Sequence, residues 1–192
     1  MDTLKTNSSV DAKGLACPMP IVKTKKAINH LNPGEVLEVL ATDKGSKADI
    51  QAWAKSSGHQ YLGTMEDGEV LKHYIRKAGE NEECEASVFE PVASNDDLLK
   101  EMDSNNDIVI LDVRESAEYA FGHIPNAISI PFGELEERIS ELDPNAKIFV
   151  VCRTGSRSDM ASQVLAEKGF SNVMNVVPGM SEWNGPKETK LN

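Results

Sequence analysis

Short apolar runs and longer amphipathic patterns alternate along this sequence of 192 residues. In the first part of the chain, the apolar runs that predict strands are 8–11, 35–41, 59–65 and 69–76. The amphipathic patterns that predict helices are 18–31 and 46–55. Asp67-Gly68, between the last two strands, is typical of a hairpin turn. We therefore expect a small two-layer α/β sandwich, in which helices pack on one sheet.

In the second part of the chain, strands and helices alternate more regularly. The predicted strands are 88–92, 108–113, 128–130, 148–151 and 173–177. The predicted helices are 95–102, 116–121, 134–142 and 158–168, followed by a short final helix after Gly179. Such alternation is typical of a doubly wound α/β domain with a largely parallel sheet. Ligands of such sheets bind beyond the carboxyl ends of the strands.

A stretch with four glutamates and little apolar content, residues 79–86, separates the two parts. We interpret it as a solvated linker, which puts one domain at 8–78 and the other at 87–187. Eight extended residues reach at most about 28 Å, a length that permits transfer between the domains of one chain. Cys84 lies in the linker. We favour an incidental exposed thiol over a role in a relay or an intermolecular disulfide.

Charge is divided unevenly along the chain. Residues 1–78 hold 11 Lys and Arg against 9 Asp and Glu, a net charge of +2. Residues 79–192 hold 9 against 22, a net charge of −13. The acidic second half argues against direct binding of nucleic acid, which is itself negatively charged. We expect most of these charges to lie on solvated surfaces, although the basic first half could meet an acidic partner.

Cysteine usage bounds the compartment. The chain has three cysteines, Cys17, Cys84 and Cys152, and no apolar signal segment near its start. This pattern favours reduced or reactive thiols over a disulfide framework and predicts a cytoplasmic protein. No apolar run is long enough to predict a membrane span. The scattered histidines have no ligand spacing with a cysteine, so we expect neither a zinc site nor another cofactor.

The most informative residues follow the predicted strand 148–151. Cys152, two arginines and Gly155 form a short loop before a helix: Cys152-Arg153-Thr154-Gly155-Ser156-Arg157-Ser158. Loop amides and the helix dipole favour an anion, so the thiol is expected to ionise easily. The arginines reinforce this effect, and Gly155 lets the backbone close over a bound group. The loop therefore predicts an activated thiolate in an anion cradle.

This loop resembles the active-site loop of the rhodanese family of sulfurtransferases. Two upstream segments, Ile110-Leu111-Asp112-Val113-Arg114-Glu115 and Gly122-His123-Ile124-Pro125-Asn126-Ala127, resemble that family's other signatures. The resemblance implies that Cys152 carries sulfur as a persulfide. It also implies that Asp112 and Arg114 support the site. From its place at a strand end, we expect Asp112 to cap the following helix.

A second motif, Gly14-Leu15-Ala16-Cys17-Pro18-Met19-Pro20, precedes the first predicted helix. Pro18 and Pro20 stiffen the start of that helix. Cys17 thus lies at a positively polarised helix end, a setting that lowers the pKa of a thiol. The motif resembles the Cys-Pro-X-Pro signature of the TusA family of sulfur carriers. The resemblance implies that Cys17 accepts and passes on a persulfide sulfur.

Together the motifs predict a relay. Cys152 takes sulfur from thiosulfate, a low-molecular-weight persulfide or a persulfidated protein, with the loop amides holding the outer sulfur and Arg157 neutralising it. Cys17 then takes the sulfur for an acceptor protein, although transfer in the opposite direction remains open. One alternative is a non-catalytic sulfur-binding or docking module. Another is a cysteine phosphatase or arsenate reductase, but phosphatase loops are one residue longer between cysteine and arginine than this one.

Overall fold

A computed structural model describes residues 4–79, 89–104 and 107–191. The chain divides into two compact units, one on each side of segment 80–88. The predicted linker, apart from Gly79, lies outside the described residues, and so does Cys84. Each unit is described below by itself.

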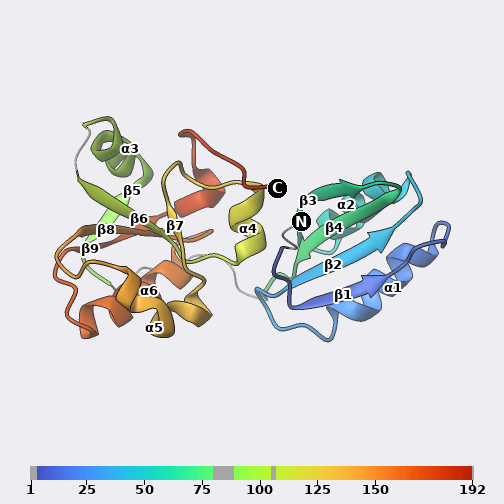
Figure 1. The fold of residues 1–192 in the computed structure, drawn as a ribbon, viewed down its shortest axis with the longest axis horizontal. Coiled ribbons are helices and arrows are strands. Elements are labelled where there is room, and N and C mark those ends of the chain that lie inside the picture. The colour runs from blue at the N-terminus through green and yellow to red at the C-terminus, as the bar shows by residue number, and fades with distance from the viewer. Residues whose placement is uncertain (1–3, 80–88, 105–106, 192) are drawn as a thin grey trace. The chain divides into compact units, whose positions relative to one another are not determined.

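The first unit is a mixed four-stranded sheet with two helices (Figure 1). Its elements in chain order are β1 (Ser8–Asp11), α1 (Met19–Ile28), β2 (Val36–Ala41), α2 (Ser46–Ser56), β3 (Gln60–Asp67) and β4 (Val70–Arg76). The strand order is β1-β2-β4-β3, in which β1 runs parallel to β2 and the other pairs are antiparallel. Both helices lie on the same side of the sheet (Figure 1). This arrangement is the expected two-layer sandwich.

Alternating apolar residues of the sheet make the core between the two layers. Leu37 and Val39 of β2 pack with Ile28 of α1 and Ile50 of α2, and all four side chains are buried. Successive strand residues point to opposite faces, so this alternation fixes which side of β2 meets the helices. The predicted hairpin is present between β3 and β4. Gly68 takes the positive φ of 62° that its tight turn requires.

The second unit is a five-stranded, wholly parallel sheet with helices on both faces (Figure 1). The strand order is β5-β9-β8-β6-β7. Its strands are β5 (Val92–Ser94), β6 (Ile108–Asp112), β7 (Ile128–Ser129), β8 (Lys147–Val151) and β9 (Val173–Val177). Its α-helices are α3 (Asn95–Asp103), α4 (Ser116–Phe121), α5 (Leu135–Arg138) and α6 (Ser156–Glu167). The expected doubly wound α/β fold is confirmed.

Strand β8 lies at the centre of this sheet and is buried on both faces. Ile148 and Val150 pack into the cluster that contains Leu165 of α6. Phe149 and Val151 belong to the cluster on the opposite face. A continuous apolar run is the expected pattern for a strand covered on both sides. The carboxyl end of β8 therefore emerges from a rigid core directly into the Cys152 loop.

Two predicted elements differ from the observed ones. The first strand of the second unit is Val92–Ser94 and not 88–92, because Pro91 has no N–H to donate to a strand ladder. The predicted helix 134–142 is broken into α5 and two flanking 3-10 turns, Phe132–Glu134 and Ile139–Glu141. Among the described helices, none combines the length and apolar character needed to cross a membrane.

Candidate active site

The Cys152 loop is closed by Gly155. Cys152 follows β8 directly, and α6 begins at Ser156. Gly155 caps α6 with a φ of 105°, which lies in the left-handed region that glycine adopts without strain. This conformation lets the Gly155 N–H donate to the Cys152 Sγ across 3.1 Å. The start of α6 thus places a hydrogen-bond donor on the sulfur, as the sequence predicts.

Ser158 is a second polar neighbour of the sulfur. Its Oγ lies 3.3 Å from the Cys152 Sγ and 2.6 Å from Oδ1 of Asn175 on β9. Both Ser158 and Asn175 are fully buried. A hydroxyl has a single proton, so Ser158 donates to one acceptor at a time. The Cys152 side chain is only 1% exposed, and yet its sulfur lies among polar donors.

The segment after β9 holds the loop from its other side. Met180 and Ser181 donate their N–H groups to the carbonyl oxygens of Cys152 and Arg153 across 2.9 and 2.8 Å. This approach depends on Gly179, where a Cβ would lie 2.5 Å from the Cys152 carbonyl oxygen. Gly179 also has a φ of 75°. Close packing of backbone on backbone therefore fixes the residue that carries the thiol.

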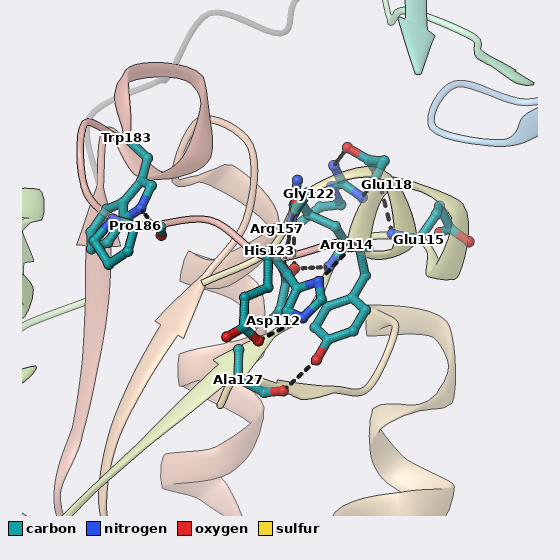
Figure 2. Close-up of polar contacts among 12 residues, drawn as sticks. Asp112, Arg114, Glu115, Glu118, Gly122, His123, Ala127, Arg157, Trp183 and Pro186 are labelled. Carbon is teal, nitrogen blue, oxygen red and sulfur yellow. Dashed lines mark hydrogen bonds and ion pairs between the residues drawn. The ribbon is translucent and has the colours of Figure 1, made fainter. Parts of the chain in front are cut away.

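Arg157 lies against a carboxylate that the sequence did not single out. Its Nη1 donates to Oε2 of Glu118 across 3.0 Å, and its Nη2 to Oε1 across 3.4 Å (Figure 2). The Glu118 side chain is fully buried, and that of Arg157 is 17% exposed. Burial opposes the charge of Arg157, but Glu118, and more weakly Cys152 and Glu115, raise the pKa of the guanidinium. Arg157 is thus a fixed cation near Cys152, paired with α4.

Asp112 and Arg114 form a second buried ion pair beside the first (Figure 2). Arg114 donates to the Asp112 carboxylate from its backbone N, Nε and Nη2, and to the Gly122 carbonyl from Nη2. The predicted capping role of Asp112 is wrong, since the N-cap of α4 is Glu115 and the Asp112 carboxylate is engaged by Arg114. Asp112 thereby orients Arg114.

The remaining predicted loop residues lie around the same turn. Arg153 and Thr154 are half-buried, and Ser156, the first residue of α6, is exposed. The Arg153 carbonyl accepts from Ser181, as described above. The structure therefore brings all the predicted loop residues together at the carboxyl end of β8.

Cys17 is exposed and precedes α1, as expected. Pro18 is the N-cap of that helix, and Pro20 is buried in its first turn. Gly14, at the start of the motif, has a φ of 71° and donates its N–H to the Thr42 hydroxyl across 2.9 Å. These contacts hold the approach to the thiol against the turn that follows β2.

The predicted lowering of the Cys17 pKa is wrong. A hydrogen bond to Asp49 of α2, followed by desolvation and the charges of Asp49 and Asp43, raises the pKa of the Cys17 thiol. Two nearby carboxylates disfavour a thiolate more than the start of α1 favours it. The sequence pattern showed the helix end but not the second helix that faces it.

Sequence reasoning missed Glu118, Asn175 and Asp49. Asn175 carried a usable signal, because it is a lone polar residue within the apolar strand 173–177. A buried polar side chain needs a partner, and here that partner is Ser158. Glu118 and Asp49 lie in ordinary amphipathic helices, so only the fold brings them to the two cysteines. Within the described ranges, no three His, Cys, Asp or Glu side chains are grouped so that they could hold a metal ion.

The two units match two families. The family model described as Sulfurtransferase TusA matches residues 8–77, and the Rhodanese-like domain model matches residues 94–186. The solved structure of a rhodanese-related protein from Thermoplasma volcanium is 33% identical, with a TM-score of 0.47. It aligns with 50% of this chain and 96% of its own.

Two proteins of Bacillus subtilis (strain 168) are also similar. The one named "Putative sulfur carrier protein YrkF" is 51% identical over 185 residues, which cover 96% of this chain and all of that relative. The one named "Putative sulfurtransferase YtwF" is 36% identical over 93 residues, or 48% of this chain and 89% of that relative. The chain belongs to the family of proteins in which a TusA domain is followed by a rhodanese domain. Its first domain is related to sulfur carriers and its second to sulfurtransferases.

Proposed function

We propose that this protein is a sulfurtransferase that relays sulfane sulfur as a persulfide, first on Cys152 and then on Cys17. The observation that carries the proposal is the N–H of Gly155 directed at the Cys152 sulfur at the start of α6. Such a donor stabilises a sulfur anion both before and after it takes up another sulfur. In this proposal the transferase domain is 87–187 and the carrier domain is 8–78.

Each step is an exchange at sulfur. The Cys152 thiolate attacks the outer sulfur of a donor, the donor's sulfur bond breaks, and the donor leaves with the electron pair. The Cys17 thiolate then attacks the outer sulfur of the Cys152 persulfide, and Cys152 leaves as a thiolate. The loop residues Arg153, Thr154, Gly155, Ser156 and Ser158 hold the transferred sulfur, and Arg157 supplies positive charge beside it. No net electron transfer occurs, so no redox cofactor takes part.

The different settings of the two thiols favour this order. Cys152 is buried, which shields a persulfide from solvent, whereas Cys17 is exposed and accessible to another protein. The carboxylates that raise the pKa of Cys17 lower its thiolate fraction. They also make its thiolate the stronger nucleophile and the poorer leaving group, so sulfur stays on Cys17 until an acceptor arrives.

The proposal leaves a defined set of partners. A low-molecular-weight persulfide, a persulfidated protein or thiosulfate would load Cys152, and an acceptor protein would unload Cys17. We place the relay in the cytoplasm, where thiols are kept reduced. The supporting observation is the cysteine usage of the chain, and a fractionation experiment with tagged protein would test it.

The direct test is intact-mass spectrometry of the full chain after incubation with an organic persulfide. We expect the mass to rise by one sulfur atom, and peptide mapping to place that sulfur on Cys152 before other sites. Cys152→Ser should abolish this loading, whereas Cys84→Ser should leave it unchanged. A wild-type chain that takes up no sulfur would favour a docking module. Turnover of phosphate esters without sulfur uptake would favour a phosphatase.

A further inference from the structure

The positive charge nearest to Cys152 is already paired. Two nitrogens of Arg157 face the two carboxylate oxygens of Glu118, a side chain with no exposed surface (Figure 2). This fork-on-fork geometry is the strongest arrangement of an arginine and a carboxylate. The guanidinium is therefore held toward α4 and is not left to follow an incoming anion.

The neighbouring guanidinium is paired in the same way. Arg114 donates three side-chain hydrogen bonds to the Asp112 carboxylate, a side chain that is fully buried (Figure 2). The charges of Glu118 and Arg157 both act on Arg114, so the two ion pairs form one cluster. Two cations and two carboxylates cancel before any substrate binds.

This balance matters for the choice of sulfur donor. Thiosulfate is a dianion, and it would have to approach a thiolate in a site where both of these arginines are already neutralised. An organic persulfide in its protonated form adds no charge. In a partly buried site a dianion without a free cation is strongly disfavoured, because burial strengthens repulsion between like charges.

We propose that Glu118 sets the donor class of this protein: by holding Arg157, it makes the Cys152 site selective for sulfur carried on an organic thiol and against the thiosulfate dianion. This inference rests on the proposed function, since it concerns the loading of Cys152. Glu118 is a positioning residue, because it acts through Arg157.

The two loading reactions differ in the charge that the site must hold. With a persulfide, Cys152–S⁻ and R–S–SH give Cys152–S–SH and R–S⁻, so one negative charge is present throughout. With thiosulfate, Cys152–S⁻ and S–SO₃²⁻ give Cys152–S–S⁻ and SO₃²⁻, so three negative charges are present throughout. In both reactions the bond to the outer sulfur breaks and the leaving group keeps the electron pair.

The experiment titrates cysteine persulfide and thiosulfate against the full chain and follows the Cys152 persulfide by peptide mapping in a single turnover. The maximal loading rate and the half-saturating donor concentration are obtained for each donor. In the wild type we expect loading efficiency with cysteine persulfide to exceed that with thiosulfate by about tenfold or more. A wild type that prefers thiosulfate would overturn the proposal, whatever the behaviour of the variants.

Glu118→Gln tests the mechanism. The amide keeps the shape of the side chain and one acceptor but removes the charge, so Arg157 becomes available to an anion. We expect the half-saturating concentration of thiosulfate to fall about tenfold, with little change for cysteine persulfide. Merely structural damage would lower loading from both donors together, so the ratio between donors separates the two explanations.

Three further variants complete the test. Glu118→Asp keeps the charge and should keep the wild-type preference, whereas Glu118→Gln with Arg157→Met should lose the gain in thiosulfate use. Glu136→Gln removes an exposed carboxylate of α5 and should behave as the wild type. An unchanged donor ratio in a folded Glu118→Gln chain contradicts the role of Glu118 alone. A wild type that accepts sulfur from neither donor contradicts the proposed function itself.

Discussion

The backbone N–H of Gly155 donates to the sulfur of Cys152 across 3.1 Å. This contact exists because Gly155 takes a left-handed conformation at the start of α6 while β8 holds Cys152 in the core. One side of the contact is thus set by a turn and the other by a buried strand. The account of the site depends on this pair, and the predictions below test what surrounds it.

Ser158→Ala should slow the loading of Cys152 several-fold, because the sulfur anion loses the hydroxyl 3.3 Å away. It should also lower the free energy of unfolding by about 1–3 kcal/mol, since the buried Asn175 oxygen loses its donor. The measurements are single-turnover loading and urea denaturation. Ser162→Ala is the matched control: Ser162 is buried one turn later and bonds only to the Ser158 carbonyl among the contacts described. Equal loading rates in the two variants would contradict the role of Ser158.

Gly179→Ala should displace the Cys152 loop. The added methyl would lie 2.5 Å from the Cys152 carbonyl oxygen, at a φ of 75° that disfavours alanine. We expect a loss of about 2 kcal/mol or more in the free energy of unfolding and slower loading of Cys152. In Gly133→Ala the methyl meets nothing within 4 Å, so that variant should keep both properties. If Gly179→Ala folds and loads like Gly133→Ala, the loop is not fixed in this way.

Asp49→Asn should make Cys17 more reactive at neutral pH. Asp49 raises the pKa of this thiol first through a hydrogen bond and then through its charge, so its removal lowers the pKa and increases the thiolate fraction. The measurement is the pH profile of iodoacetamide alkylation in a Cys84→Ser, Cys152→Ser background. Asp67→Asn, which removes an exposed carboxylate paired with Lys72, serves as the control. A profile for Asp49→Asn that stays in place or moves to higher pH would refute the assignment.

The first domain should lose stability in mild acid through His73. Burial, with a smaller effect from Lys47, lowers the pKa of His73 from 6.5 to about 4. Between these values the unfolded chain binds the extra proton and the folded chain does not, so stability falls as the pH falls. The full loss is about 3 kcal/mol, complete near pH 4.

Denaturation of the chain between pH 7 and pH 4 tests this expectation, read from a probe in the first domain. His73 contacts Ser46, Tyr61 and Thr64 through its ring nitrogens, so His73→Gln should be less stable at pH 7. It should also show a flatter dependence on pH, whereas replacement of the exposed His30 by Gln should keep the wild-type slope. An equal slope in His73→Gln would show that other groups cause the acid effect.

Most of the fold could be predicted because each element carries a local pattern. The strand 173–177 and the helix 116–121 were predicted with their observed bounds, since apolar periodicity and turn residues mark both ends. The helix expected at 134–142 was less well predicted, because 3-10 turns and α-helix share the same apolar spacing over a few residues.

The site was predictable only where its residues are contiguous in sequence. The loop from Cys152 to Ser158 is one segment, so its motif shows both the nucleophile and the helix start that faces it. Glu118 and Asp49 act across the fold, and no spacing in the sequence connects them with Arg157 or Cys17. Long-range electrostatics therefore explains why the predicted pKa of Cys17 was wrong in direction.

The central claim is that sulfur enters at Cys152 and reaches Cys17 from there. The most direct measurement is a time course with a persulfide donor labelled in its outer sulfur, in a Cys84→Ser chain, with the label mapped to cysteine peptides. We predict that the label appears on the Cys152 peptide before the Cys17 peptide, and that Cys152→Ser leaves Cys17 unlabelled. Labelling of Cys17 at the normal rate in the Cys152→Ser chain would contradict the account.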